Sequence, residues 1–121
     1  MDDPKSQPSV LIVGAGPTGL ALALWLTKIG VKVRVIDKSP STLGTSRAIV
    51  VHARTLEFYR QLGIADEMVS RGFPFPALNL WVKAKPRARF SLGLAGQGLS
   101  PYPFVLIFPQ DEHEKLLTEH L

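Results

Sequence analysis

The chain contains no cysteine and no long uninterrupted hydrophobic run. The first absence excludes disulfides, thiolate nucleophiles and cysteine-ligated metal sites, and it fits a reducing, cytoplasmic location. The second leaves no membrane span, which needs about 18 consecutive apolar residues. The first eight residues, MDDPKSQP, lack the apolar core of a signal peptide. Residues 1–8 are therefore expected to form a flexible tail.

An excess of charge of one sign is also lacking. The formal net charge is +4 over 121 residues, which suits an anionic cofactor but is too small and dispersed to indicate nucleic-acid binding. One basic cluster is interpreted as a solvated turn rather than a nucleic-acid patch; it comprises Lys83, Lys85, Arg87 and Arg89. The three histidines have no spacing typical of metal ligands, so no metal site is expected.

Periodicity predicts strand, helix and strand near the start of the chain. Val10–Val13 is a continuous apolar run, typical of a strand buried in a parallel sheet. Residues 17–28 are apolar nearly all round, which predicts a buried helix that ends at Gly30. Alternating valines from residue 31 predict a second strand that ends at 36 or 37. The fold class is therefore α/β, with a Rossmann-like, right-handed βαβ unit.

The rest of the chain predicts a mixture of helices and antiparallel strands. Helices are expected over about 55–63 and 64–71, and a strand over 105–108. Alternation over 78–82 and 88–92 predicts an inserted antiparallel hairpin that turns near Lys85–Pro86. A final helix is expected to open on a capping box made by Asp111 and Glu114. Its apolar stripe still runs at Leu121, which favours a truncated domain over a natural end.

Gly14, Gly16 and Gly19 form a GxGxxG motif between the first strand and the first helix. The first glycine permits the tight turn, the second lets a pyrophosphate approach the backbone, and the third allows close helix–strand packing. Asp37 follows 18 residues after Gly19, near the spacing of the carboxylate that binds the adenosine ribose. It argues against a 2′-phosphate. A glycine turn used for packing alone is the alternative, and the motif does not distinguish NAD from FAD.

Four segments resemble the group A flavoprotein aromatic hydroxylases, the family of para-hydroxybenzoate and phenol hydroxylases. They are VLIVGAGPTGL, VIDKSP, SRAIVVHARTLEFYRQLGI and PQDEHEKLLTEHL. The resemblance implies that Arg47 contacts the FAD pyrophosphate and ribityl region and that Gln110 faces the flavin. An exposed loop arginine and a helix-entry glutamine are the alternatives. The implied FAD-binding set is Gly14, Gly16, Pro17, Thr18, Gly19, Asp37, Lys38, Arg47 and Gln110, with Lys38 alternatively a surface residue.

The resemblance also implies an activity and a domain organisation. NADPH or NADH would reduce FAD, and the reduced flavin would use O₂ to hydroxylate a small aromatic substrate, phenolic or polyketide-like. Residues 9–76 and 101–121 would form part of the FAD-binding domain, and 77–100 would begin the antiparallel substrate-domain sheet. The family's downstream Gly-Asp-Ala segment is missing. An N-terminal fragment that needs the remainder of the polypeptide, or a homo-oligomer partner, is therefore expected.

Two other functions remain open at this point. An NAD-dependent dehydrogenase would use the same glycine motif and Asp37 but would leave Arg47 and Gln110 without a role. A truncated, non-catalytic binding fragment would use its exposed sheet edges. No residue of the sequence stands out as a catalytic base.

Overall fold

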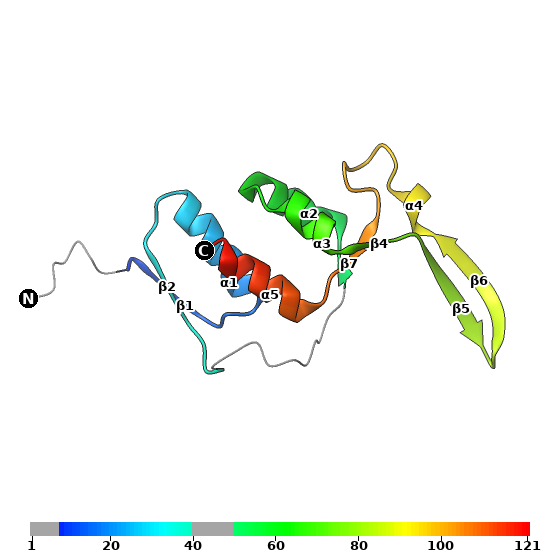
Figure 1. The fold of residues 1–121 in the computed structure, drawn as a ribbon, viewed down its shortest axis with the longest axis horizontal. Helices are drawn as coiled ribbons and strands as arrows, with labels where there is room; N and C mark the ends of the chain where they lie inside the picture. The colour runs from blue at the N-terminus through cyan, green and yellow to red at the C-terminus, as the bar shows by residue number, and fades with distance from the viewer. Residues whose placement is uncertain (1–7, 40–49) are drawn as a thin grey trace, which may run out of the picture. The chain divides into compact units, whose positions relative to one another are not determined.

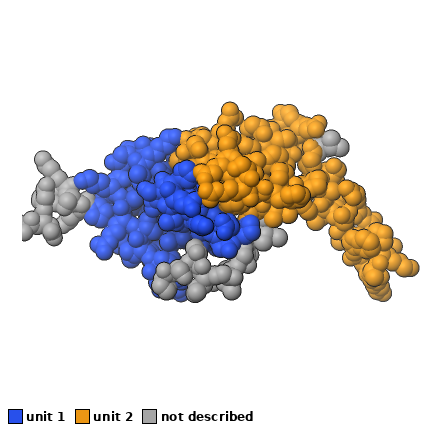
Figure 2. All heavy atoms as spheres, viewed as in Figure 1, with its two compact units in different colours: residues 1–48, 109–121 blue, residues 49–108 orange. Residues whose placement is uncertain are grey.

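The computed structural model describes residues 8–39 and 50–121. It divides the chain into two compact units, which Figure 2 colours separately. Unit 1 comprises residues 1–48 and 109–121, and unit 2 comprises residues 49–108. These boundaries differ from those of the predicted FAD-binding domain, 9–76 with 101–121. That domain assignment stays a prediction. None of the helices in the described ranges is long and apolar enough to cross a membrane.

Unit 1 contains the predicted βαβ unit. Strand β1 (Val10–Val13) pairs in parallel with β2 (Val33–Ile36), and α1 (Pro17–Lys28) connects them. Helix α5 (Gln110–Glu119) packs against α1, as Figure 1 shows. The α/β fold class and the strand–helix–strand order are therefore confirmed.

Strand β2 begins two residues later than the valine alternation predicts, because the chain is still closing α1. Gly30, at φ +82°, donates its N–H to Thr27 O at 3.0 Å, and Val31 donates to Leu26 O at 2.9 Å. This pair of bonds is a Schellman motif, which satisfies carbonyls at the end of the helix.

The core of unit 1 is formed by the inner faces of α1, α5 and β1. Its buried residues are Ile12, Leu20, Ala23, Leu24, Leu116 and Leu117. The prediction that α1 is a buried helix is wrong for one part of its surface in the structure described, since Leu22 is 47% exposed. Leu121, placed by the sequence on the apolar stripe of the last helix, is also exposed.

Unit 2 is built on a three-stranded antiparallel sheet of order β3–β7–β4. The strands are β3 (Val50–Val51), β7 (Val105–Ile107) and β4 (Phe73–Phe75), and α2 (Ala53–Leu62) and α3 (Ala65–Arg71) lie between β3 and β4 in the chain. Strands β3 and β4 were not predicted. They have two and three residues, too few for a period of two to be recognised, and β4 contains a proline.

The predicted hairpin is present as β5 (Ala77–Val82) and β6 (Lys85–Ser91), and the short helix α4 (Leu92–Ala95) follows. The predicted turn position is wrong. Lys83 and Ala84, at φ +49° and +58°, make the two-residue turn that suits the strand twist. Pro86 lies inside β6 at a register shift opposite Trp81, where a missing N–H is tolerated.

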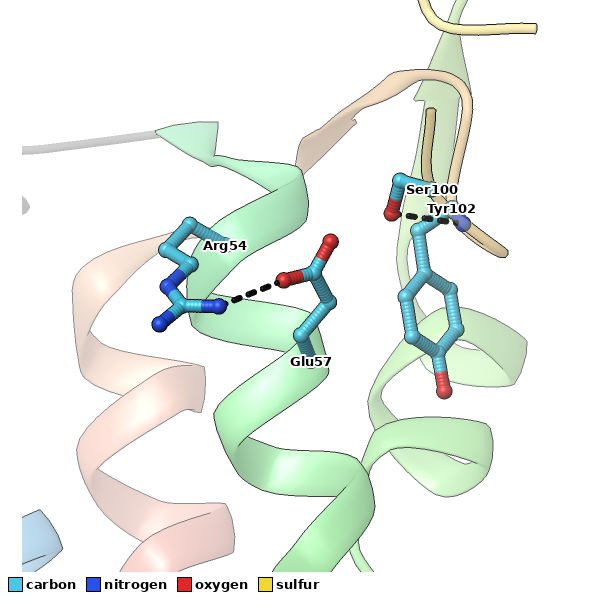
Figure 3. Close-up of polar contacts among 4 residues, drawn as sticks. All are labelled: Arg54, Glu57, Ser100 and Tyr102. Carbon is cyan, nitrogen blue, oxygen red and sulfur yellow. Dashed lines mark hydrogen bonds and ion pairs between the residues drawn. The ribbon is translucent and has the colours of Figure 1, made fainter. Parts of the chain in front are cut away.

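Four polar or aromatic residues of α2 and of the segment that precedes β7 are drawn in Figure 3. Arg54 Nη1 donates to Glu57 Oε2 at 3.0 Å, and the Tyr102 N–H donates to Ser100 Oγ at 3.1 Å. The Ser100 hydroxyl and then the Arg54 guanidinium lower the pKa of the Glu57 carboxyl from its ordinary value. Tyr102 itself is buried, and its ring packs edge to face on that of Phe104 with the two ring centroids 6.3 Å apart. The four residues drawn lie wholly in unit 2.

Candidate functional site

The glycine motif forms a tight loop between β1 and α1. Gly14 has φ +112°, a backbone conformation that side chains rarely adopt. Its N–H donates to Ile36 O at 2.7 Å. The start of the loop is therefore fixed to the end of β2.

Gly19 brings the first turn of α1 against this loop. A Cβ on Gly19 would lie 2.0 Å from Gly14 O and 3.3 Å from Ile12 Cγ2. The first of these separations is impossible for a real side chain, so only glycine permits this approach of helix to strand.

Gly16 is the N-cap residue of α1 and presents an open face. It has extended backbone at φ −73°, and no side chain caps the helix. Pro17 follows at the first helical position, which leaves the Thr18 and Gly19 amides in a turn where helix geometry supplies no acceptor. The first turn carries no acidic residue. The positive end of the helix dipole and these amides make this loop suitable for a diphosphate.

Asp37 holds the loop from the end of β2. Its Oδ2 accepts from the Ala15 N–H at 2.6 Å, and its Oδ1 accepts from the Ser39 N–H at 2.7 Å. These two backbone bonds, the Ala15 bond first, lower the pKa of the Asp37 carboxyl from its ordinary value. Asp37 is exposed, so its remaining lone pairs stay accessible to a ribose hydroxyl. Lys38 beside it is also exposed.

Helix α5 brings Gln110 and Glu114 to the same loop. Gln110 Nε2 donates to Glu114 Oε1 at 2.7 Å, and that oxygen lies 4.0 Å from the position a Cβ on Gly16 would take. The predicted capping box is wrong, because α5 begins at Gln110 with Pro109 as N-cap and no side-chain cap. The Glu114 carboxylate instead bonds one turn back along its own helix.

Two other polar groups of α5 are buried. Asp111 Oδ1 has no hydrogen-bond partner within the described ranges. Burial lowers the pKa of His113 to about 4, so the imidazole is neutral near pH 7. Neither group belongs to the predicted site.

The structure thus brings together Gly14, Gly16, Pro17, Thr18, Gly19, Asp37, Lys38 and Gln110 within unit 1. Arg47 lies outside the described residues. Sequence reasoning missed Ala15 and Glu114; the i, i+4 spacing of Gln110 and Glu114 was the available signal for the second. A surface hollow of about 770 Å³ along β2, lined by Val31, Arg34 and Leu121 among others, shares no residue with the glycine loop.

The chain matches a known protein family along almost its whole length. Residues 7–121 match the family model described as an FAD binding domain. The chain belongs to the FAD-binding domain family. This family and the relatives below confirm the predicted resemblance to flavoprotein aromatic hydroxylases and FAD as the cofactor.

Curated relatives of this FAD-binding domain are monooxygenases. The chain is 44% identical over 114 residues to 6-methylpretetramide 4-monooxygenase of Streptomyces rimosus, covering 94% of the chain and 20% of the relative. It is 39% identical over 122 residues to pentachlorophenol 4-monooxygenase of Sphingobium chlorophenolicum, covering 97% and 21%. The chain therefore spans about a fifth of the length of these relatives.

Solved structures share the fold. The p-nitrophenol 4-monooxygenase PnpA from Pseudomonas putida DLL-E4 superposes with a TM-score of 0.83 at 27% identity, covering 92% of this chain and 28% of that one. The flavin-dependent monooxygenase PieE, solved in complex with FAD and substrate, superposes with a TM-score of 0.80 at 31% identity, covering 98% and 22%.

Proposed function

We propose that this chain is the FAD-binding segment of an FAD-dependent monooxygenase that hydroxylates a small aromatic compound. The observation that carries the proposal is the open face of Gly16 at the N-terminus of α1, in a chain that belongs to the FAD-binding domain family. The names of the relatives, which act on a pretetramide, on pentachlorophenol and on p-nitrophenol, support an aromatic substrate.

The residues of the loop would hold the adenosine diphosphate half of FAD. The amides of Thr18 and Gly19 would donate to the diphosphate. Pro17 has no N–H, so it adds no further unsatisfied donor to this turn. Asp37 would accept from a ribose hydroxyl while its bond to Ala15 keeps the loop in place.

Three further residues are proposed from the family resemblance. Arg47 would donate to phosphate oxygens with its planar guanidinium, and Lys38 would lie near the adenosine end. Gln110 would face the flavin from the start of α5.

FAD held by these residues would supply the redox chemistry, with NADPH or NADH as the electron donor and O₂ as the oxygen source. The described residues of this chain would bind and orient that cofactor, and we assign them no catalytic base. We also propose a cytoplasmic location, which is compatible with the cysteine-free sequence.

Titration of the 121-residue chain with FAD, followed by calorimetry and by the visible flavin spectrum, tests the proposal. FAD is expected to bind weakly, because the chain spans about a fifth of its relatives' length, and to be displaced by ADP but not by riboflavin. Preferential binding of NAD⁺ over FAD would instead favour a nicotinamide-dependent dehydrogenase, and the absence of nucleotide binding by the wild type and by every variant described below would refute the proposal. Gly16→Ala is the matched variant, since it changes the loop surface by one methyl group.

A further inference from the structure

Glu114 is the side chain that borders the open face of Gly16. A Cβ on Gly16 would lie 4.0 Å from Glu114 Oε1, and beyond the local backbone no nearer atom is found among the described residues. In GxGxxG loops this face is where a pyrophosphate approaches the main chain. A diphosphate bound there would therefore meet a carboxylate. This step rests on the proposed function.

The carboxylate is held in this place by its own helix. Gln110 Nε2 donates to the same oxygen, Glu114 Oε1, at 2.7 Å. Leu116 and Leu117 are fully buried and anchor α5, which packs against α1. Glu114 itself is half-buried, and its bond to Gln110 favours the rotamer that keeps the carboxylate beside Gly16.

We infer that Glu114 is a negative determinant of dinucleotide affinity: held by Gln110 beside Gly16, its carboxylate repels the diphosphate of an ADP-containing cofactor. The first turn of α1 carries no acidic residue, so the anion that faces this turn comes from α5. Like charges a few ångströms apart repel strongly where solvent screening is incomplete. The residue thereby lowers the affinity that the loop amides would otherwise give.

Calorimetric titration of the full chain with ADP, FAD and riboflavin tests this inference. Glu114→Gln keeps the shape of the side chain and an oxygen that can accept from Gln110, but it removes the charge. It is expected to tighten ADP and FAD binding by the same factor, about tenfold, which corresponds to about 1.4 kcal/mol. Riboflavin, which has no phosphate, should show no change. The gain should shrink at high ionic strength.

Glu112→Gln is the matched control. It makes the same change of charge on the same helix at an exposed position, and less than a twofold effect is expected. Glu114→Asp, which keeps the charge but withdraws it by one methylene, should tighten ADP binding relative to the wild type, by less than Glu114→Gln does. If circular dichroism shows that the glutamine variant is unfolded, an aspartate variant whose ADP affinity is unchanged or weaker overturns the inference.

The outcomes separate this inference from the proposed function. If the wild-type chain binds FAD but removal of the Glu114 charge leaves ADP affinity unchanged or weaker, the inference is overturned and the proposed function stands. If only Glu114→Gln binds measurably, both are supported. If neither the wild type nor any variant binds ADP or FAD, both are refuted.

Discussion

Replacing Gly19 by alanine separates the packing of the glycine loop from its binding surface. The new Cβ would lie 2.0 Å from Gly14 O, whereas real Cβ contacts are essentially never below 3.0 Å. The helix and the loop would therefore have to separate by about 1 Å. Overpacking of this kind costs typically about 1–3 kcal/mol and occasionally more. Because the clash is with a backbone atom, the upper end of this range applies. Alanine recovers up to about 1 kcal/mol of helix propensity, so a net loss of about 2 kcal/mol is expected.

Thermal unfolding followed by circular dichroism measures this loss. A decrease of about 2 kcal/mol corresponds to a fall in the midpoint of roughly 10 °C for a chain of this size. Gly16→Ala is the control, because among the described residues its Cβ would meet only Glu114 Oε1, at 4.0 Å, and its φ of −73° suits alanine. Its stability should stay within about 0.5 kcal/mol of the wild type, while FAD affinity falls more than tenfold. A Gly19→Ala chain as stable as the wild type would refute the packing geometry.

Three further predictions concern stability. Burial lowers the pKa of His113 to about 4 from 6.5. The folded state therefore holds the imidazole neutral, and the free energy of unfolding is highest above about pH 6.5 and falls as the pH falls towards 4. Urea unfolding should show a loss of about 1–3 kcal/mol over this range, and His113→Leu should abolish it. The pKa of Asp37 is lowered below 3.8, so its contribution is present above that pH and is lost as the pH falls below it; the acid limb of a melting-temperature profile should be flatter in Asp37→Asn. Ala84 has φ +58° in the hairpin turn, so Ala84→Gly should raise the melting temperature by relieving about 1 kcal/mol of strain, and an unchanged or lower value would contradict that turn geometry.

The sequence predicted those elements whose pattern is long and local. Helix α1 and strands β1 and β2 follow from an apolar run, a helical stretch and an alternation that lie next to one another in the chain. Strands β3 and β4 were not predicted because they form by pairing with β7, which lies about 30 or more residues further along the chain. The turn of the hairpin was predicted at the wrong position because Pro86 was interpreted as a turn residue. The register shift accommodates that proline within β6.

The site was predictable to the same limit. The glycine spacing and Asp37 belong to one βαβ unit, so their proximity follows from local structure. Glu114 lies almost 100 residues beyond Gly16, and only the packing of α5 on α1 brings its carboxylate to the loop. Its spacing of three residues from Asp111 predicted a capping box. The observed hydrogen bond instead joins it to Gln110, four residues earlier.

The contacts of the loop also decide how Asp37 would act in binding. Gly14 is fixed by Ile36 O, Ala15 by the Asp37 carboxylate and Gly19 by close packing, so the loop is ordered by its own chain, and less ordering entropy is lost on binding. If Asp37 acts mainly through Ala15, Asp37→Ala, which removes the acceptor, should weaken the binding of inorganic pyrophosphate, which has no ribose, by about the same factor as that of FAD. If it acts mainly through the ribose hydroxyl, only FAD affinity should fall. The 2.6 Å bond to Ala15 favours the first outcome, and an unchanged pyrophosphate affinity in Asp37→Ala would contradict it.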